Sequence, residues 1–337
     1  MSAISNKTVA IFNPWEVIEV DPLVDACRHR LIDGLRQAPM SEALIRYFEG
    51  GKMLRARLVF TAASAVGGDP SLGIAAAEAI ELLHGASLVH DDIIDEASER
   101  RGVPALHIQL GIGTALALGD YLLLRAFAVM VNAGPAGSQV IELLITLSSY
   151  GQDCCVGQIA ELGGAGNIES EEEYFAMVRA KTGSLFAAAA TAGAIVGGGT
   201  RPEIEALQAF GFSLGVSFQI YDDMVEIMGE RQDSGKSIGR SIVQERPLLP
   251  LIYLANRGTP ESLAEYNAIR SKENIKLSVS LLKREGIFDL IVAAQEYYIN
   301  SAREALKSLR LSSDLAKLNA FLEGCQCRPL FELEHRQ

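Results

Sequence analysis

The 337-residue sequence lacks the cysteine and leader patterns of secreted and zinc-binding proteins. Its five cysteines are Cys27, Cys154, Cys155, Cys325 and Cys327, and none stands in the CxxC spacing of a zinc site. Because their number is odd and no framework is visible, we expect reduced thiols and a cytoplasmic location. The first residues, MSAISNKTVAIFNPW, lack the basic and then apolar order of a secretory signal peptide.

Positive charge and long apolar runs are also scarce. The chain has 30 Lys and Arg against 42 Asp and Glu, a net charge of −12. Nucleic-acid backbones select basic surfaces, so we expect no general nucleic-acid binding. No stretch of about 18 residues is apolar without a charge or a glycine cluster, so we expect no integral membrane segment. An anionic substrate would need local cationic side chains or metal ions to offset the negative field.

Strand-like alternation is scarce as well, and helical patterns fill the chain. Residues 73–95 place apolar side chains at three- and four-residue spacing. Helix starts are marked by Ser170 with Glu173, a capping box, and by Thr200 with Pro202. Residues are 49% hydrophobic, enough for a large core, and no long linker or repeat is visible. The pattern predicts one all-α domain over 1–337, a helical bundle with a core of about 25–330.

An acidic cluster ends the helix expected over residues 73–95. Asp91 and Asp95 are four residues apart and share one helix face, while Asp92 lies about 100° round the axis. Like charges at this spacing repel, so the cluster is favourable where a cation lies between the carboxylates. Alone, it fits a solvated surface as well as a metal site.

A second cluster repeats the spacing of the first. Asp222, Asp223 and Glu226 again stand at i, i+1 and i+4 after an apolar run. Mg²⁺ is a hard cation that takes one or two carboxylates and completes its shell with water and phosphate oxygens. Two acidic clusters that face each other across a bundle could therefore hold a diphosphate through bridging ions.

Cationic residues stand at positions that suit the same ligand. Arg presents a planar fork to phosphate and Lys a compact charge, although each one alone is most often a surface residue. The candidates are Lys52 and Arg55 after a double glycine, Arg100 and Arg101, Lys181 beside Thr182, and Lys236.

Together, these motifs resemble those of the trans-isoprenyl diphosphate synthases, or polyprenyl synthetases. The order GGKMLR, HDDIIDEASERRG, GDYLLLRAF, KTGSLF, FQIYDD and GKSIG covers almost the whole chain. The resemblance implies a helical bundle around a deep central cavity, usually a homodimer. It implies a prenyltransferase that condenses isopentenyl diphosphate with an allylic diphosphate, releases diphosphate, and uses about three Mg²⁺ ions per active site.

The resemblance also assigns roles to individual residues. Asp91, Asp95 and Asp222 would bind metal, and Asp92 would support the first motif, so that these four and Lys181 are the catalytic candidates. Contacts to the allylic diphosphate would come from Arg100, Lys181, Thr182, Gln219 and Lys236. Contacts to isopentenyl diphosphate would come from Lys52, Arg55, His84 and Arg101.

Several positions depart from the family pattern. Met53 and Ala56 replace an Arg and a Pro that are common there, and the second motif ends in Glu226 rather than Asp. The largest departure falls within 237–248, where Ser241, Glu245, Arg246 and Leu248 stand in place of Asp, Gly, Lys and Thr. Arg246 supplies the charge of the missing lysine with a different geometry, and we expect residues 235–250 to behave unusually.

Product length in such enzymes depends on the side chains just before the first motif. Here these are Ala86 and Ser87, both small, so a bulky aromatic floor is missing. We therefore expect geranylgeranyl diphosphate (C20), with a longer polyprenyl diphosphate as the near alternative.

Three other functions are compatible with parts of the sequence. A class I terpene cyclase also uses an aspartate-rich motif, but it needs no second diphosphate site. A non-catalytic subunit that modulates another synthase would fit the altered 237–248 segment, although both acidic clusters persist. A di-iron bundle needs two Glu-x-x-His helices; Glu81 with His84 supplies one, but Glu332 and His335 lie in a polar tail.

Overall fold

The computed structural model describes residues 21–134, 137–163, 168–228, 246–270, 281–309 and 315–327. Helices dominate these residues, and the predicted all-α class is confirmed. The longer helices are α1 (Pro22–Leu35), α3 (Leu54–Ala65), α4 (Ile74–Ile94), α6 (Ile112–Ala133), α7 (Ser138–Gly163), α9 (Ser184–Val196), α10 (Arg201–Met228), α13 (Pro260–Arg270) and α15 (Ile287–Leu306). The shorter elements are α2 (Ser41–Phe48), the 3₁₀ turn η2 (Pro70–Gly73), β1 (Glu99–Arg100), β2 (Val103–Pro104), α5 (Leu106–Leu110), α8 (Glu171–Val178), the π-turn η3 (Arg179–Gly183), α12 (Leu249–Arg257) and α16 (Leu315–Glu323).

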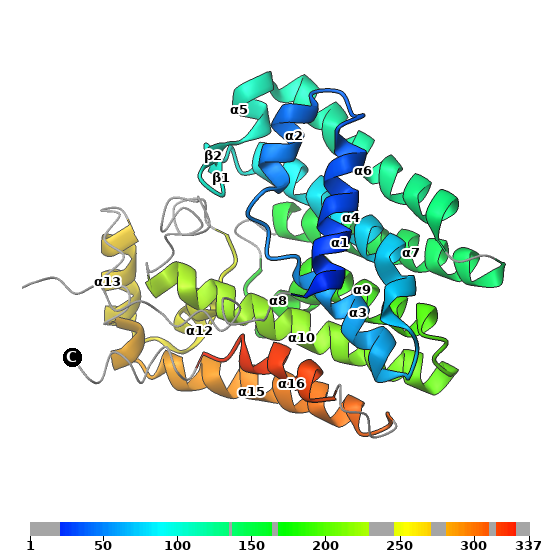
Figure 1. Cartoon of the computed structure of the whole chain (residues 1–337). Helices are drawn as coiled ribbons and strands as arrows, with labels where there is room; N and C mark the ends of the chain where they lie inside the picture. Colours follow the sequence, from blue (N-terminus) through cyan, green and yellow to red (C-terminus); the bar gives the residue numbers. More distant parts are fainter. Residues whose placement is uncertain are drawn as a thin grey trace, which may run out of the picture.

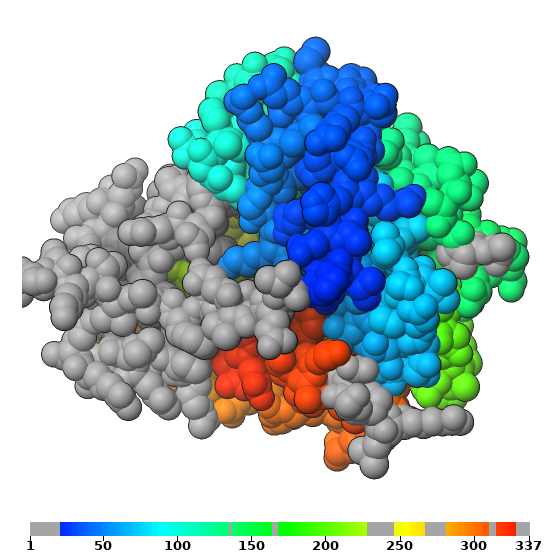
Figure 2. All heavy atoms as spheres, in the orientation of Figure 1, coloured from blue at the N-terminus to red at the C-terminus, as the bar shows by residue number. Residues whose placement is uncertain are grey.

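Helix α9 lies at the centre of the bundle, and every one of its residues is buried. Helices α3, α7 and α10 pack around it, and α15 covers the outer side of α10 (Figure 1). In the space-filling view, α1 and α2 form the upper part of the visible face, and α15 and α16 form its lower edge (Figure 2). The sequence of α9, SLFAAAATAGAIV, explains its position, because small apolar side chains let several helices approach it at once.

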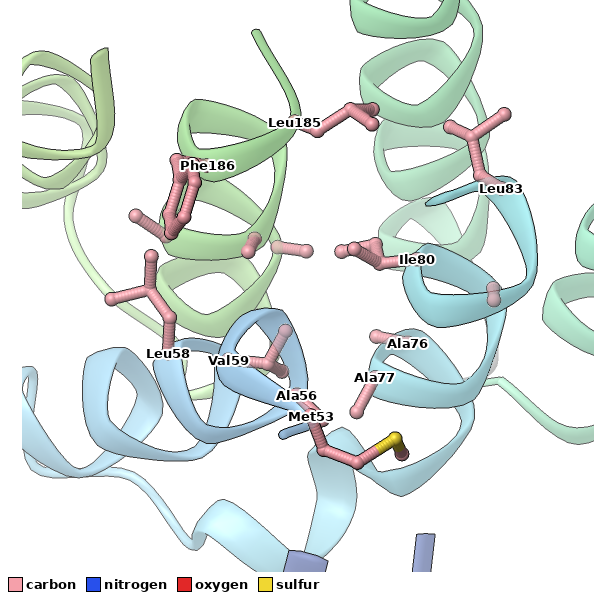
Figure 3. Packing of buried hydrophobic residues seen from close by; sticks show 14 of the residues in the cluster. Met53, Ala56, Leu58, Val59, Ala76, Ala77, Ile80, Leu83, Leu185 and Phe186 are labelled. Carbon is pink, nitrogen blue, oxygen red and sulfur yellow. The ribbon is translucent and has the colours of Figure 1, made fainter. Parts of the chain in front are cut away.

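The contact between α3, α4 and α9 shows how close this packing is. Val59 of α3, Ile80 of α4 and Leu185 of α9 are among the buried side chains that meet there (Figure 3). Gly193 lies so close to α3 that an added Cβ would stand 2.2 Å from the Val59 carbonyl oxygen. Only glycine fits at this crossing. This close contact fixes α3, which carries Arg55, against α9.

The helix starts predicted at Ser170 and Thr200 are confirmed. Ser170 and Glu173 form the capping box of α8, each binding the other residue's backbone N–H. The Thr200 backbone N–H donates to Glu203 at 2.8 Å before α10 begins at Arg201. The first acidic motif lies at the C-terminal end of α4, where Asp95 is the capping residue.

Two helices among the described residues are long and apolar enough to cross a membrane by length and composition. In α4 with its preceding turn, 72% of the most apolar window is buried inside the protein, as in a core helix. In α6 the corresponding share is 39%. The expectation of no integral membrane segment stays a prediction. Helix α6 leaves most of its apolar window exposed.

Candidate active site

A cavity of about 560 Å³ opens between the C-terminal halves of α4 and α7, the turn η3, helix α10 and residues 246–248. It brings together many of the residues that the sequence singled out, among them nine for which the family resemblance predicts a role. These are Arg55, His84, Ser87, Asp91, Arg100, Lys181, Thr182, Gln219 and Asp222. Apolar side chains form much of the remaining wall, namely Leu88, Ile93, Ile94, Leu116, Ile159, Leu162, Leu185 and Phe218. Charge and apolar surface are thus combined in one space.

The three aspartates of the first motif have different surroundings. Asp91 lines the cavity, whereas Asp92 is turned into the protein and is 1% exposed. The Tyr47 hydroxyl donates to Asp92 Oδ2 at 2.7 Å, and Arg100 Nε donates to Asp92 Oδ1 at 3.0 Å. Asp95 is also buried and forms an ion pair with Arg246. Each carboxylate therefore has its own environment, which limits the repulsion expected from their spacing.

The second motif, on α10, also contains one buried aspartate. Asp222 and Asp223 both line the cavity, but Asp223 is buried and only 2% exposed. Asp223 accepts hydrogen bonds from Tyr174 at 2.6 Å, from Gln219 at 2.9 Å and from the backbone N–H of Leu249 at 3.1 Å. Burial raises the pKa of Asp223 to about 7, although these hydrogen bonds act in the opposite direction.

Lys181 and Thr182 lie in a π-turn rather than in a regular helix. The turn η3 joins α8 to α9, and such insertions are frequent at functional sites. The Lys181 ammonium donates to Glu161 of α7 at 2.6 Å. Burial disfavours its charge, but Asp91 and Glu161 outweigh this effect and raise the pKa of Lys181. Thr182 donates to Gln219 Oε1 at 2.9 Å, so that the turn is tied to the second motif.

A second group of cations surrounds His84. The Arg55 guanidinium lies 4.6 Å from the centre of the Phe186 ring, a cation–π contact that fixes its position. Burial, followed by the charges of Arg55, Arg101 and Arg100, lowers the pKa of His84 well below its usual value. His84 is therefore neutral at pH 7. Its imidazole can donate or accept a hydrogen bond. The three neighbouring guanidinium groups make this part of the protein suitable for an anionic ligand.

Arg101 is held in place by a tight turn. It has φ +54° and precedes Gly102 at φ +77° in the hairpin that joins β1 to β2, a turn that requires positive φ at both positions. Its Nη1 donates to the carbonyl of Tyr47 at 3.3 Å. A Cβ added to Gly51 would lie 3.0 Å from the same nitrogen, so that the glycine before Lys52 makes room for Arg101.

Several predicted residues lie outside the cavity lining. Lys52 is exposed at the start of α3, and Arg101 lies behind Arg100. Ala86 is 3% exposed and packs in the core, whereas Ser87 lines the cavity, because adjacent residues on a helix point about 100° apart. Lys236, together with Ser241, Glu245, Glu332 and His335, lies outside the described residues.

Tyr47, Tyr174 and Glu161 were not predicted from the sequence. The tyrosines are separated along the chain from their aspartate partners by 45 and 49 residues, and Glu161 lies 20 residues before Lys181. No local spacing could have revealed these pairs. The only signal is the double aspartate in each motif, which implies that one of the two must be satisfied inside the protein.

The carboxylates suit a hard divalent cation by their chemistry. Asp91 and Asp222 approach the same cavity from α4 and α10, and Asp95 lies one turn beyond Asp91. Within the described ranges, no three His, Cys, Asp or Glu side chains lie together as a ready metal site. This arrangement fits Mg²⁺, which binds through one or two carboxylates and completes its shell with water and phosphate oxygens.

Comparison with known proteins agrees with this geometry. The sequence profile described as polyprenyl synthetase matches residues 37–281. The chain belongs to the polyprenyl synthetase family. A short chain isoprenyl diphosphate synthase of Methanothermobacter thermautotrophicus is 34% identical over 280 residues, covering 80% of this chain and 86% of that protein. A nonaprenyl diphosphate synthase of Mycobacterium tuberculosis is 37% identical over 234 residues, covering 67% and 68%.

A solved structure agrees as well. The polyprenyl synthase of Caulobacter crescentus, in complex with calcium and isoprenyl diphosphate, superposes with a TM-score of 0.80 at 27% identity. The match covers 90% of this polyprenyl synthetase and 94% of that chain. The predicted family and enzyme class are confirmed: the protein is a trans-prenyltransferase. Its relatives make both short and long products, so the family alone leaves the product length open.

Proposed function

We propose that this enzyme condenses isopentenyl diphosphate with an allylic diphosphate and releases geranylgeranyl diphosphate (C20). The observation that carries the proposal is the cavity itself, in which acidic residues, cations and an apolar wall meet. Arg100, Lys181, Thr182 and Gln219 would hold the allylic diphosphate beside Asp91 and Asp222. Arg55 and His84, with Arg101 and Lys52 at the edge, would hold isopentenyl diphosphate.

The cationic side chains stabilise the charge that develops on the departing diphosphate. Lys181 is charged and held by Glu161, and Arg100 is held by Asp92, so neither must reorganise during the reaction. Mg²⁺, about three ions at Asp91, Asp95 and Asp222, would supply further charge neutralisation on the diphosphate. The apolar wall would exclude water from the allylic cation until the double bond of isopentenyl diphosphate attacks it.

The lining of the cavity supports a product of at least intermediate length. Ser87 is the residue before the first motif that faces the cavity, and its side chain is small. Leu116, Ile159 and Leu162 continue the wall toward the outside between α6 and α7, where each is at least half exposed. A chain that grows along this wall has apolar contacts and no aromatic side chain at Ser87 to stop it.

The exposed side of α6 and α7 supports a homodimer. Large apolar side chains recur along it at helical spacing, and an apolar area of this kind on a helix pair is typical of an obligate interface. The exposed residues are Ile112, Leu116, Leu124, Val131, Ile141, Ile145, Val156, Ile159 and Leu162. A second copy would pair the same surface with itself about a two-fold axis.

The dimer can be tested by light scattering during size exclusion. We expect a mass of about twice 36.2 kDa for the wild type and a monomer for Leu124→Glu, since Leu124 is 69% exposed on α6. Tyr297→Glu is the matched control, because Tyr297 is 67% exposed on α15. A monomeric wild type would contradict the proposal.

The reaction can be tested with labelled isopentenyl diphosphate, Mg²⁺ and each allylic primer in turn, followed by chain-length analysis. We expect incorporation of label into a C20 product and no turnover by Asp91→Ala. A main product of another length would refute the geranylgeranyl assignment. No incorporation with any primer would favour the alternative of a non-catalytic modulating subunit.

A further inference from the structure

Arg246 lies where a metal ion is expected to bind. It comes from the segment that departs most from the family pattern, and it forms an ion pair with Asp95. Both side chains are largely buried, with 17% of Arg246 and 5% of Asp95 exposed. Arg246 also lines the cavity and interacts electrostatically with Asp91. A single guanidinium thus faces both carboxylates of the first motif that are expected to bind metal.

The backbone around Arg246 is restrained on the side that leads into α12. The next residue is Pro247, and a residue before proline is confined to extended conformations. Two residues further, the backbone N–H of Leu249 donates to Asp223 of the second motif at 3.1 Å. Residues 246–249 therefore connect the two acidic motifs, with an ion pair at one end and a hydrogen bond at the other. Because the segment is restrained, the ion pair requires little further ordering.

Asp95 needs a counter-cation when no metal is bound. A buried carboxylate without a partner is strongly unfavourable, and an arginine can satisfy it directly. A divalent cation that binds the same carboxylate has to displace the guanidinium, since both require the same oxygen atoms. The apparent affinity for the metal then equals the intrinsic affinity multiplied by the fraction of molecules in which the carboxylate is accessible.

We propose that Arg246 is an internal competitor for the divalent-cation site of the first motif, neutralising Asp95 in the metal-free enzyme and setting the metal concentration that the enzyme requires. The inference rests on the proposed metal role of Asp91 and Asp95. It concerns the binding of metal before substrate, and so it can be tested without turnover.

The first test is calorimetric titration of substrate-free protein with Mg²⁺, in the wild type and in Arg246→Gln. If the ion pair is present in about nine-tenths of the molecules, its loss strengthens Mg²⁺ binding about tenfold. Arg36→Gln is the matched control, because it removes the same charge from an exposed pair with Asp33 on α1. Tighter binding by Arg246→Gln alone supports the proposal, and unchanged or weaker binding overturns it.

Thermal unfolding supplies a readout that a general loss of structure would not give. Without metal, Arg246→Gln should unfold at a lower temperature than the wild type, because the buried ion pair with Asp95 is lost. Saturating Mg²⁺ should stabilise this variant more than it stabilises the wild type, since ligand binding and stability are linked. An equal gain in both proteins would overturn the proposal.

A measurement on the wild type covers the case in which Arg246→Gln does not fold. Phenylglyoxal modifies accessible guanidinium groups, and the modified position can be read by mass spectrometry. Mg²⁺ alone should increase modification of Arg246 severalfold and leave Arg36 unchanged; no increase at Arg246 would overturn the proposal. Prenyl transfer by the wild type is assayed separately, so that failure of the proposed function is distinguished from failure of this inference.

Discussion

Replacing Arg100 by glutamine separates two roles that the structure combines in one side chain. Arg100 is a predicted ligand of the allylic diphosphate, and it is also the cationic partner of the buried Asp92. Glutamine removes the charge and the guanidinium fork. In the variant, Asp92 loses its hydrogen bonds from Arg100 and keeps the one from the Tyr47 hydroxyl.

The size of the effect follows from the burial of the pair. Asp92 is 1% and Arg100 10% exposed at the side chain, so water can do little to replace the lost partner. Removing one member of a buried ion pair costs about 3–5 kcal/mol. The cost should be near the lower end of this range, because the Tyr47 hydroxyl at 2.7 Å still stabilises the carboxylate. Tyr47→Phe alone should cost less, about 1–2 kcal/mol.

The assay is urea unfolding of metal-free protein, combined with steady-state kinetics. Arg100→Gln should lower the free energy of unfolding, and Asp92→Asn combined with Arg100→Gln should recover part of the loss because no buried charge is left unpaired. If Arg100 also binds the allylic diphosphate, KM for that substrate stays raised in the double variant although stability recovers. A loss below about 1 kcal/mol in Arg100→Gln, or no recovery in the double variant, would refute the reasoning.

Three further changes test other parts of the site. Ser87→Phe should shorten the product in a chain-length assay, because the ring enters the cavity, while Ala86→Ser, outside the lining, should leave the product unchanged. The pKa of His84 is lowered on folding, so the unfolded chain binds a proton first and stability falls as pH drops below about 6.5. The free energy of unfolding, measured with urea, should therefore fall between about pH 7.5 and 5.5 by about 1.4 kcal/mol more in the wild type than in His84→Asn. An equal fall in both proteins would contradict this prediction. Gly157→Ala should lower the melting temperature, since its Cβ would lie 2.3 Å from a backbone nitrogen of η3, whereas Gly113→Ala, with open space, should not.

Much of the fold was predictable because the signals are local. Apolar spacing along residues 73–95 and the cap at Ser170 and Glu173 depend only on near neighbours in the chain, and the structure has both as expected. The same is true of the acidic clusters, whose i, i+4 spacing places Asp91 and Asp95 one turn apart at the end of α4. Of the cations that the family resemblance named, Arg55, Arg100 and Lys181 line the cavity.

The remaining features depend on contacts that are distant in the sequence. The buried aspartate of each pair accepts a hydrogen bond from Tyr47 or Tyr174, which approach from α2 and α8. The π-turn at Lys181 depends on close packing against α7, where Gly157 admits its backbone. Neither feature has a periodic signal in the sequence, because each arises when two elements meet.

The adjacent aspartates in the two motifs have different surroundings for a geometric reason. Consecutive helical residues point about 100° apart, so the two carboxylates of a pair differ in burial, and Asp92 and Asp223 are almost fully buried. In both motifs the buried residue, Asp92 or Asp223, accepts a hydrogen bond from a buried tyrosine. Asparagine at Asp91 or Asp222 should therefore reduce turnover with little effect on unfolding. Asparagine at Asp92 or Asp223 should affect unfolding first, because both are buried, and a smaller effect on turnover should follow from the loss of the contacts to Arg100 and Gln219.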